Sequence, residues 1–353
     1  MERSADFYFL GLDSGSVSLN AVITDDSGRV LFSRYLRNGG RPIDAAVRVF
    51  GEMLEKLGDI EICAGLAVGS GKELLAVPIG FAVDNEIPAH ALAAITFHPQ
   101  INSIIEIGGQ DSKFIRIGRD RQGRPHMQDH SFNDLCAAGT GAFLDQQAER
   151  MGLNIGEFSR LAALSSKPAR IAGRCSVFAK TDMIHQQQKG TPPEDIAAGL
   201  CYALVRNYMA NLCRGKRPET PICFQGGVAG NDGVLRAFKD ILELHDDEMI
   251  RPENYDIMGA LGAAFMAAKL PEIHPTKLSD LKKRLESADI VDKAVSDIKP
   301  LVRPDFQLDS PHGSVPAVDP VGKLFLGLDV GSVSTKAAVI DSGARLVASS
   351  YVP

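Results

Sequence analysis

The chain has 353 residues, of which 44% are hydrophobic and 23% charged, and its formal net charge is −6. These values suit a globular protein of two lobes, exclude a disordered or collagen-like chain, and argue against a nucleic-acid partner. No apolar run is long enough to cross a bilayer, and the polar start from Met1 to Asp6 lacks a signal peptide. We therefore expect a cytoplasmic protein with no membrane partner.

The predicted elements alternate between strands and helices. In chain order they are a strand–turn–strand unit at 8–23, a helix at 45–57, a strand at 62–68, a short helix at 89–94, a second strand–turn–strand unit at 103–117, helices at 141–150, 177–188 and 197–213, a strand at 221–224, and helices at 233–244 and 258–270. Alternation of this kind predicts an α/β fold in which helices cover the sheets.

An internal repeat divides the chain further. Residues 9–18 read FLGLDSGSVS and residues 325–334 read FLGLDVGSVS, so nine of ten positions match. A long repeat indicates duplicated architecture. We interpret 323–353 as the truncated start of a second unit; the alternative is a duplicated edge hairpin within a single domain. A charged helix and a Pro-rich linker are expected over 271–322.

The first unit is expected to form two lobes. We place the first lobe at 1–95 and the second at 96–255, with 256–270 packing back on the first. Each lobe would contribute one of the two strand–turn–strand units.

Glycine-rich turns in both units carry the first chemical signal. In the first, Asp13 ends a strand and Gly15 and Ser16 follow it. Glycine lets backbone N–H groups approach a ligand, the serine adds a hydroxyl, and the carboxylate can face Mg²⁺ through water. The second turn repeats this logic with Glu106, Gly108, Gly109, Gln110 and Asp111. Two such hairpins facing one another would clamp a polyphosphate.

A third glycine turn follows the predicted strand at 221–224. It reads Gln225-Gly226-Gly227-Val228-Ala229-Gly230-Asn231 and leads into a helix. A base or ribose can lie against such a backbone, and the helix N-terminus offers N–H groups. Found alone, this pattern is more often a plain strand-to-helix turn.

Taken together, the ordered motifs FLGLDSGS, IGGQDSK and FQGGVAGN resemble the phosphate and adenosine motifs of the actin, hexokinase and heat-shock chaperone ATPase superfamily. Two further stretches, NDLCAAGTGAFL at 133–144 and AGRCSVF at 172–178, resemble the ATP-dependent activators of 2-hydroxyacyl-CoA dehydratases and benzoyl-CoA reductases. The likeness covers roughly residues 7–269. Long members of that family carry two units in tandem, which would account for the repeat.

The resemblance implies two ribonuclease-H-like lobes with ATP or ADP in the cleft between them. It implies that Asp13 and Asp111 organise Mg²⁺ and that Glu106 or Gln110 orients the attacking water. Backbone groups of the two hairpin turns, at Gly15, Ser16, Gly108 and Gly109, would hold the phosphates. Gly226, Gly227 and Asn231 would hold the nucleoside.

Two of the six cysteines precede predicted helices. Cys136 and Cys175 therefore lie at or near helix N-termini, where the helix dipole favours a thiolate. A pair so far apart in sequence is usually two unrelated core residues. The resemblance implies instead that two units share one 4Fe–4S cluster, each giving these two cysteines, either in a homodimer or with the second repeat as a pseudo-dimer. The remaining cysteines lie in apolar settings typical of core.

The sequence departs from the family pattern in two places, the end of the first turn and the start of the second. The first turn normally runs on to Thr-Lys, but here it reads Leu19-Asn20; the second repeat keeps Thr335-Lys336. Glu106 stands where an aspartate is usual. Both departures bear on the hydrolysis rate more than on nucleotide binding.

The function implied is an ATP-hydrolysing, iron–sulfur activator that passes a low-potential electron to a partner dehydratase or reductase acting on acyl-CoA substrates. An amino-sugar-type kinase of the same superfamily would use the same ATP motifs without a cluster. A nucleotide-sensing module without catalysis is a third possibility, to which Leu19-Asn20 lends mild support.

Overall fold

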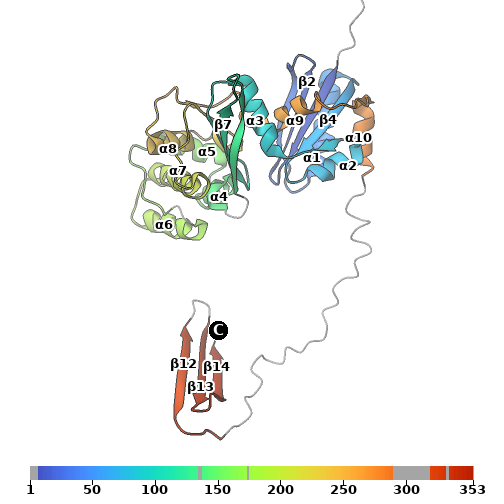
Figure 1. Cartoon of the computed structure of the whole chain (residues 1–353). Helices are drawn as coiled ribbons and strands as arrows, with labels where there is room; N and C mark the ends of the chain where they lie inside the picture. Colours follow the sequence, from blue (N-terminus) through green and yellow to red (C-terminus); the bar gives the residue numbers. More distant parts are fainter. Residues whose placement is uncertain (1–6, 134–136, 173–174, 289–318, 331–333, 353) are drawn as a thin grey trace, which may run out of the picture. The chain divides into compact units, whose positions relative to one another are not determined.

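The computed structural model describes residues 7–133, 137–172, 175–288, 319–330 and 334–352 (Figure 1). The chain divides into two compact units, Met1–Ile290 and Val291–Pro353. Within the described residues, no helix is both long enough and apolar enough to cross a membrane.

The first lobe is built on a mixed sheet in the order β11-β4-β1-β2-β3, with β5 beside β4. β1 pairs antiparallel with β2 and parallel with β4. Its strands are β1 (Tyr8–Ser14), β2 (Ser18–Asp25), β3 (Val30–Arg37), β4 (Glu61–Val68), β5 (Ala82–Val83) and β11 (Thr276–Lys277). Its helices are α1 (Pro42–Leu57), α2 (Lys72–Ile79), α9 (Met258–Ala267) and α10 (Leu278–Glu286).

Both faces of this sheet are covered, which explains why β1 and β4 are nearly continuous apolar runs. Leu10 and Leu12 pack with α1, α2 and α10, whereas Phe9 packs with α9. Gly11 lies directly under α9, where a Cβ would come within 1.9 Å of the Ala260 carbonyl oxygen. The sequence therefore places the smallest residue where a helix crosses the strand.

The second lobe repeats this plan with the sheet order β10-β9-β6-β7-β8. Its strands are β6 (Ser103–Ile107), β7 (Ser112–Arg119), β8 (Pro125–Asn133), β9 (Ile222–Gln225) and β10 (Met249–Ile250). Its helices are α4 (Gly141–Arg150), α5 (Ile155–Leu164), α6 (Ser176–Gln188), α7 (Pro193–Tyr208) and α8 (Asp232–Leu242), with single turns at Ala137–Gly139, Met209–Cys213 and Gly227–Gly230.

In each lobe three antiparallel strands are followed by a strand parallel to the first. This is the ribonuclease-H-like topology, so the expected fold class is confirmed. Helix α3 (Glu86–Phe97) connects the lobes and packs on α9. The two helices touch at Gly262, whose Cβ would lie 1.9 Å from the Ala89 carbonyl oxygen. Figure 1 shows α3 between the two sheets.

Several elements were not expected from the sequence. The strands β3 and β8 and the helices α2 and α5 escaped the periodicity argument, although Asn154 and Glu157 form a capping box that marks the start of α5. Helix α10 was expected in the linker. It belongs instead to the first-lobe core, where Leu278, Leu281 and Leu285 are buried against α1 and α2. The orange α9 and α10 accordingly lie among the blue elements in Figure 1.

The second unit contains a three-stranded antiparallel sheet of β12 (Leu324–Val330), β13 (Thr335–Asp341) and β14 (Leu346–Val352). The repeat therefore extends one strand beyond the expected hairpin. Its first two strands pair in the register of β1 and β2: Asp329 lies opposite Lys336, as Asp13 lies opposite Asn20.

Candidate nucleotide site between the lobes

The two glycine turns predicted to hold phosphate meet face to face. Gly109, in the β6–β7 turn, lies against Val17 in the β1–β2 turn, and a Cβ on Gly109 would come within 2.5 Å of Val17 Cγ2. A pocket opens between the two turns, which we call the turn pocket. The turn pocket is lined by Gly226 and Gly227 from the third motif. It is also lined by every residue predicted at the two turns, namely Asp13, Gly15, Ser16, Glu106, Gly108, Gly109, Gln110 and Asp111.

Two hydrogen bonds hold the first turn at the end of β1. The Gly15 N–H donates to the Ser18 carbonyl at 2.9 Å, and the Asn38 side chain donates to the Gly15 carbonyl at 3.0 Å. Asp13 is 8% exposed. A Cβ on Gly259 of α9 would lie 2.2 Å from Asp13 Oδ2, so the helix N-terminus packs directly on this carboxylate.

The second turn is joined to helix α4. Within the turn, the Gly108 N–H donates to the Asp111 carbonyl at 3.0 Å. The first N–H groups of α4, those of Gly141 and Ala142, donate to the Gly108 and Gly109 carbonyls at 2.9 and 2.7 Å. A displacement of this turn would therefore move the start of α4.

Lys113, for which no role was predicted from the sequence, is the central cation of the turn pocket. Its side chain is 2% exposed, and its Nζ lies 2.9 Å from Glu86, 3.0 Å from Glu106 and 2.9 Å from Asp111. These carboxylates come from α3, β6 and the β6–β7 turn. A lysine at the start of a buried strand, just after a carboxylate turn, was the available signal in the sequence, because a buried lysine needs partners.

Burial governs the protonation of this cluster. It raises the pKa of Asp13 to about 7, with a further rise from the charge of Glu86. It raises the pKa of Glu106 to about 8, against the opposing pull of Lys113. The three neighbouring carboxylates hold the pKa of Lys113 well above its usual range despite the burial of its side chain.

A histidine at the lobe boundary is structural. His90 on α3 is 5% exposed, and its Nδ1 lies 3.1 Å from Gln225 Nε2. Burial lowers the pKa of His90 well below its usual value, so it adds no positive charge to the pocket.

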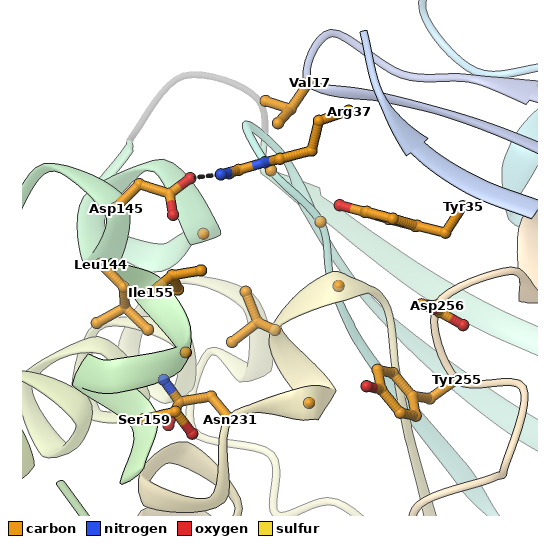
Figure 2. Close-up of a pocket in the computed structure, with 17 residues that line it drawn as sticks. Val17, Tyr35, Arg37, Leu144, Asp145, Ile155, Ser159, Asn231, Tyr255 and Asp256 are labelled. Carbon is orange, nitrogen blue, oxygen red and sulfur yellow. Dashed lines mark hydrogen bonds and ion pairs between the residues drawn. The ribbon is translucent and has the colours of Figure 1, made fainter. Parts of the chain in front are cut away.

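A larger cavity of about 300 Å³ adjoins the turn pocket (Figure 2). Both pockets are lined by Gly108, Gly109 and Gly227. The cavity wall on the first lobe is formed by Tyr35 and Arg37 of β3, which the sequence analysis missed. On the second lobe, side chains from α4, α5, the third glycine turn and the β10–α9 loop line it; these are Leu144, Asp145, Ile155, Ser159, Val228, Asn231, Tyr255 and Asp256.

Asn231 is suited to contact a nucleoside in this cavity. Its Oδ1 caps α8 by accepting from the Val234 N–H at 3.1 Å. Its Nδ2 is buried and has no partner. A buried amide without a hydrogen bond is costly, so a ribose hydroxyl or a base acceptor in this pocket would satisfy it.

The predicted cluster cysteines are placed only in part. Cys136 lies outside the described residues. Cys175 is half-buried at the N-cap of α6, whereas Cys63, Cys201, Cys213 and Cys223 are buried. Among the described residues, no group of three or more His, Cys, Asp and Glu side chains could hold a metal ion. The carboxylates of the turn pocket nevertheless suit Mg²⁺, which takes one or two protein carboxylates and completes its shell with phosphate and water.

Comparison with known proteins agrees with this geometry. The BadF/BadG/BcrA/BcrD ATPase family matches residues 10–267. The chain is 32% identical over 264 residues to the (R)-2-hydroxyglutaryl-CoA dehydratase activating ATPase of Acidaminococcus fermentans, with 74% of this chain and 97% of that protein covered. It is also 32% identical over 270 residues to the activator of lactoyl-CoA dehydratase of Anaerotignum propionicum, with 74% and 97% covered.

Two solved structures share the fold. Component A of the Acidaminococcus fermentans (R)-2-hydroxyglutaryl-CoA dehydratase superposes with a TM-score of 0.66 at 30% identity, covering 74% of this chain and 98% of that one. The activator of the 2-hydroxyisocaproyl-CoA dehydratase from Clostridium difficile, with bound ADPNP, superposes with a TM-score of 0.65 at 26% identity, covering 79% and 97%.

Proposed function

The chain belongs to the BadF/BadG/BcrA/BcrD ATPase family, and on that premise we propose that it hydrolyses ATP to drive a low-potential electron into a partner dehydratase or reductase acting on acyl-CoA substrates. The observation that carries the proposal is the meeting of two glycine turns, one from each lobe, with a buried carboxylate beside each. Relatives named as dehydratase activators, one of them bound to ADPNP, support it.

The proposal assigns a role to each group around the turn pocket. Backbone N–H groups of the two turns would hold the phosphates, as Gly-rich turns do in other nucleotide sites. Asp13 and Asp111 would hold Mg²⁺, which would offset the charge of the phosphates. Glu106 or Gln110 would orient the attacking water. Lys113 would keep three carboxylates in place, because removing one partner of a buried ion pair leaves uncompensated charge.

The nucleoside would occupy the adjoining cavity. Gly226 has a φ of 89°, and a Cβ there would lie 2.4 Å from the Ile107 carbonyl oxygen, so the strand-to-turn path needs glycine. Gly227 lies near the Tyr35 hydroxyl, and Gly230 lies against Tyr255. Two tyrosines thus flank the backbone along which a base would lie.

Helix α4 offers a route from the nucleotide to the electron-transfer centre. Its first two N–H groups are bonded to the second glycine turn, and its N-terminus follows the segment that contains Cys136. We assign Cys136 and Cys175 as ligands of a 4Fe–4S cluster that two units share, since two thiolates are half of the set that such a cluster needs. A homodimer, or a pairing with the second repeat, would supply the other half.

The test is anaerobic reconstitution of the chain with iron and sulfide, followed by assays of iron, oligomeric state and phosphate release. We expect about four irons per dimer and phosphate release without any sugar acceptor. Cys136→Ser and Cys175→Ser should lose iron and dimer together, whereas Cys63→Ala, at a buried cysteine of β4, should keep both. A monomer without iron above background would refute the cluster, and absence of phosphate release would refute the ATPase.

A further inference from the structure

Among the positions at which the two repeats differ, one lies opposite the aspartate that precedes the glycine turn. In the second unit Lys336 lies opposite Asp329 in the β12–β13 ladder, and its Nζ is 3.3 Å from Asp329 Oδ2. In the first unit Asn20 occupies the same place opposite Asp13. Directly opposite residues of an antiparallel pair share a face. The first unit therefore has a neutral amide where the second has an ammonium.

Asn20 is buried at the turn pocket, and its amide oxygen has no hydrogen-bond partner. The side chain is 7% exposed and lines the turn pocket. It lies beside the Asp13 carboxyl, whose pKa is raised by burial and lowered by this amide, whereas its Oδ1 is buried and has no hydrogen-bond partner. A carbonyl oxygen attracts a cation and repels a phosphate oxygen, so this amide does not replace the missing lysine as a phosphate partner.

The absence of a lysine at position 20 affects the charge balance of the turn pocket. Five carboxylates line it: Asp13, Glu86, Glu106, Asp111 and Asp256. Among the described residues of the lining, Lys113 provides the single ammonium or guanidinium group. Its Nζ is already within 3.0 Å of three carboxylates. A polyphosphate would therefore meet an excess of negative charge in a poorly solvated site, where repulsion is strong.

We propose that Asn20 makes nucleotide binding by the first unit conditional on a divalent cation. The inference rests on the proposed function, since it concerns the same site. Mg²⁺ prefers oxygen ligands, so when bound it would supply beside Asp13 the positive charge that Lys336 provides beside Asp329 in the second repeat. Asp13, and Asn20 through its Oδ1, are the groups that would face it.

The test measures the ATP affinity of the whole chain by calorimetry, once with Mg²⁺ and once with EDTA, at one fixed pH. In wild type we expect EDTA to weaken binding on the order of 100-fold. Asn20→Lys should strengthen metal-free binding by about tenfold, which corresponds to about 1.4 kcal/mol, and change Mg-ATP binding by less than about threefold.

Matched variants separate charge from other effects. Asp26→Asn raises the net charge by the same amount as Asn20→Lys, but at an exposed position of the first lobe. It should change neither the affinity for Mg-ATP nor the affinity for metal-free ATP. Asn20→Leu removes the amide without adding charge and should leave metal-free binding as weak as in wild type. Asp13→Asn removes one negative charge from the same pair, so it should also strengthen metal-free binding, and it tests the proposal if Asn20→Lys fails to fold.

The outcomes are distinct from those that test the ATPase. Equal gains for both nucleotide forms in Asn20→Lys, or a gain in Asn20→Leu, would overturn this inference while leaving the nucleotide site intact. Absence of binding by wild type under both conditions would instead overturn the proposed function.

Discussion

Arg37 of β3 in the first lobe forms an ion pair with Asp145 of α4 in the second lobe, at the edge of the larger cavity (Figure 2). Both side chains are partly exposed. Since α4 is also bonded to the second glycine turn, this helix has contacts with both walls of the cavity. The pair therefore joins β3 of the first lobe to the helix whose first N–H groups bond to the second glycine turn.

We expect Arg37→Ala and Asp145→Ala each to weaken nucleotide binding by about two- to fivefold, because an exposed pair contributes up to about 1 kcal/mol. The double variant should be no weaker than either single one, and thermal stability should hardly change. Nucleotide titration of the complete double-mutant cycle measures the coupling. Arg41→Ala breaks an exposed pair with Asp44 within the first lobe and serves as the control. Additive losses would show that the two side chains act independently.

Removal of either turn carboxylate should impair hydrolysis more than binding. For Asp13→Ala and Asp111→Ala we expect phosphate release to fall by about 10²–10³-fold, the scale of a lost electrostatic contact in a transition state. Affinity for Mg-ATP should fall much less, because the turn backbones remain. Phosphate-release kinetics and nucleotide titration measure the two effects, with Asp26→Ala as a surface control. Unchanged hydrolysis in both variants would exclude the role in holding Mg²⁺.

The stability of the nucleotide-free protein should fall as the pH rises from about 4 to about 8. Asp13 and Glu106 have folded-state pKa values of about 7 and about 8, above those of unfolded carboxyls. In that window the folded state keeps protons that the unfolded state has lost, so the free energy of unfolding decreases by up to about 1.4 kcal/mol per pH unit for each group. Urea unfolding across this range measures the slope.

The matched variant for this pH dependence is Glu106→Gln, which cannot release a proton and should flatten the decline. Glu55→Gln, at an exposed position of α1, should leave the slope unchanged. A slope in Glu106→Gln as steep as in wild type would show that Glu106 does not carry the effect.

Two helical glycines should respond to alanine with opposite signs. Gly262 lies where α9 touches α3, and its Cβ would approach the Ala89 carbonyl oxygen within 1.9 Å. Gly262→Ala should destabilise the protein by about 1–3 kcal/mol, because two backbones must separate. Gly51 of α1 has open space, with Lys282 Cε at 3.8 Å. Gly51→Ala should stabilise by about 0.5–1 kcal/mol through helix propensity. Denaturant midpoints compare them, and destabilisation by both substitutions would contradict this account.

The parts of the site that could be predicted from sequence are those in which one short segment contains both the residues that form the turn and the side chains that would bind a ligand. The turns at Gly15 and Gly108 combine a strand end, glycine and carboxylate within a few residues, and the structure brings both to the turn pocket. The same holds for the repeat at Phe325, whose third strand alone was missed. Cys136 lies outside the described residues, so its role stays a prediction.

The order of the glycine turns, the repeat and the α/β alternation could be predicted from sequence, because turn chemistry and hydrophobic periodicity depend on neighbouring residues. The two ribonuclease-H-like lobes were implied by the resemblance of the ordered motifs to a known ATPase superfamily and not by periodicity, which missed β3 and β8. The partners of Lys113, the pairing of Arg37 with Asp145 and the attachment of α10 to the first lobe could be found in the folded structure alone. Each of these contacts joins segments far apart in the chain. A buried lysine predicts that carboxylates lie near it. That Glu86 is one of them depends on how α3 packs between the lobes.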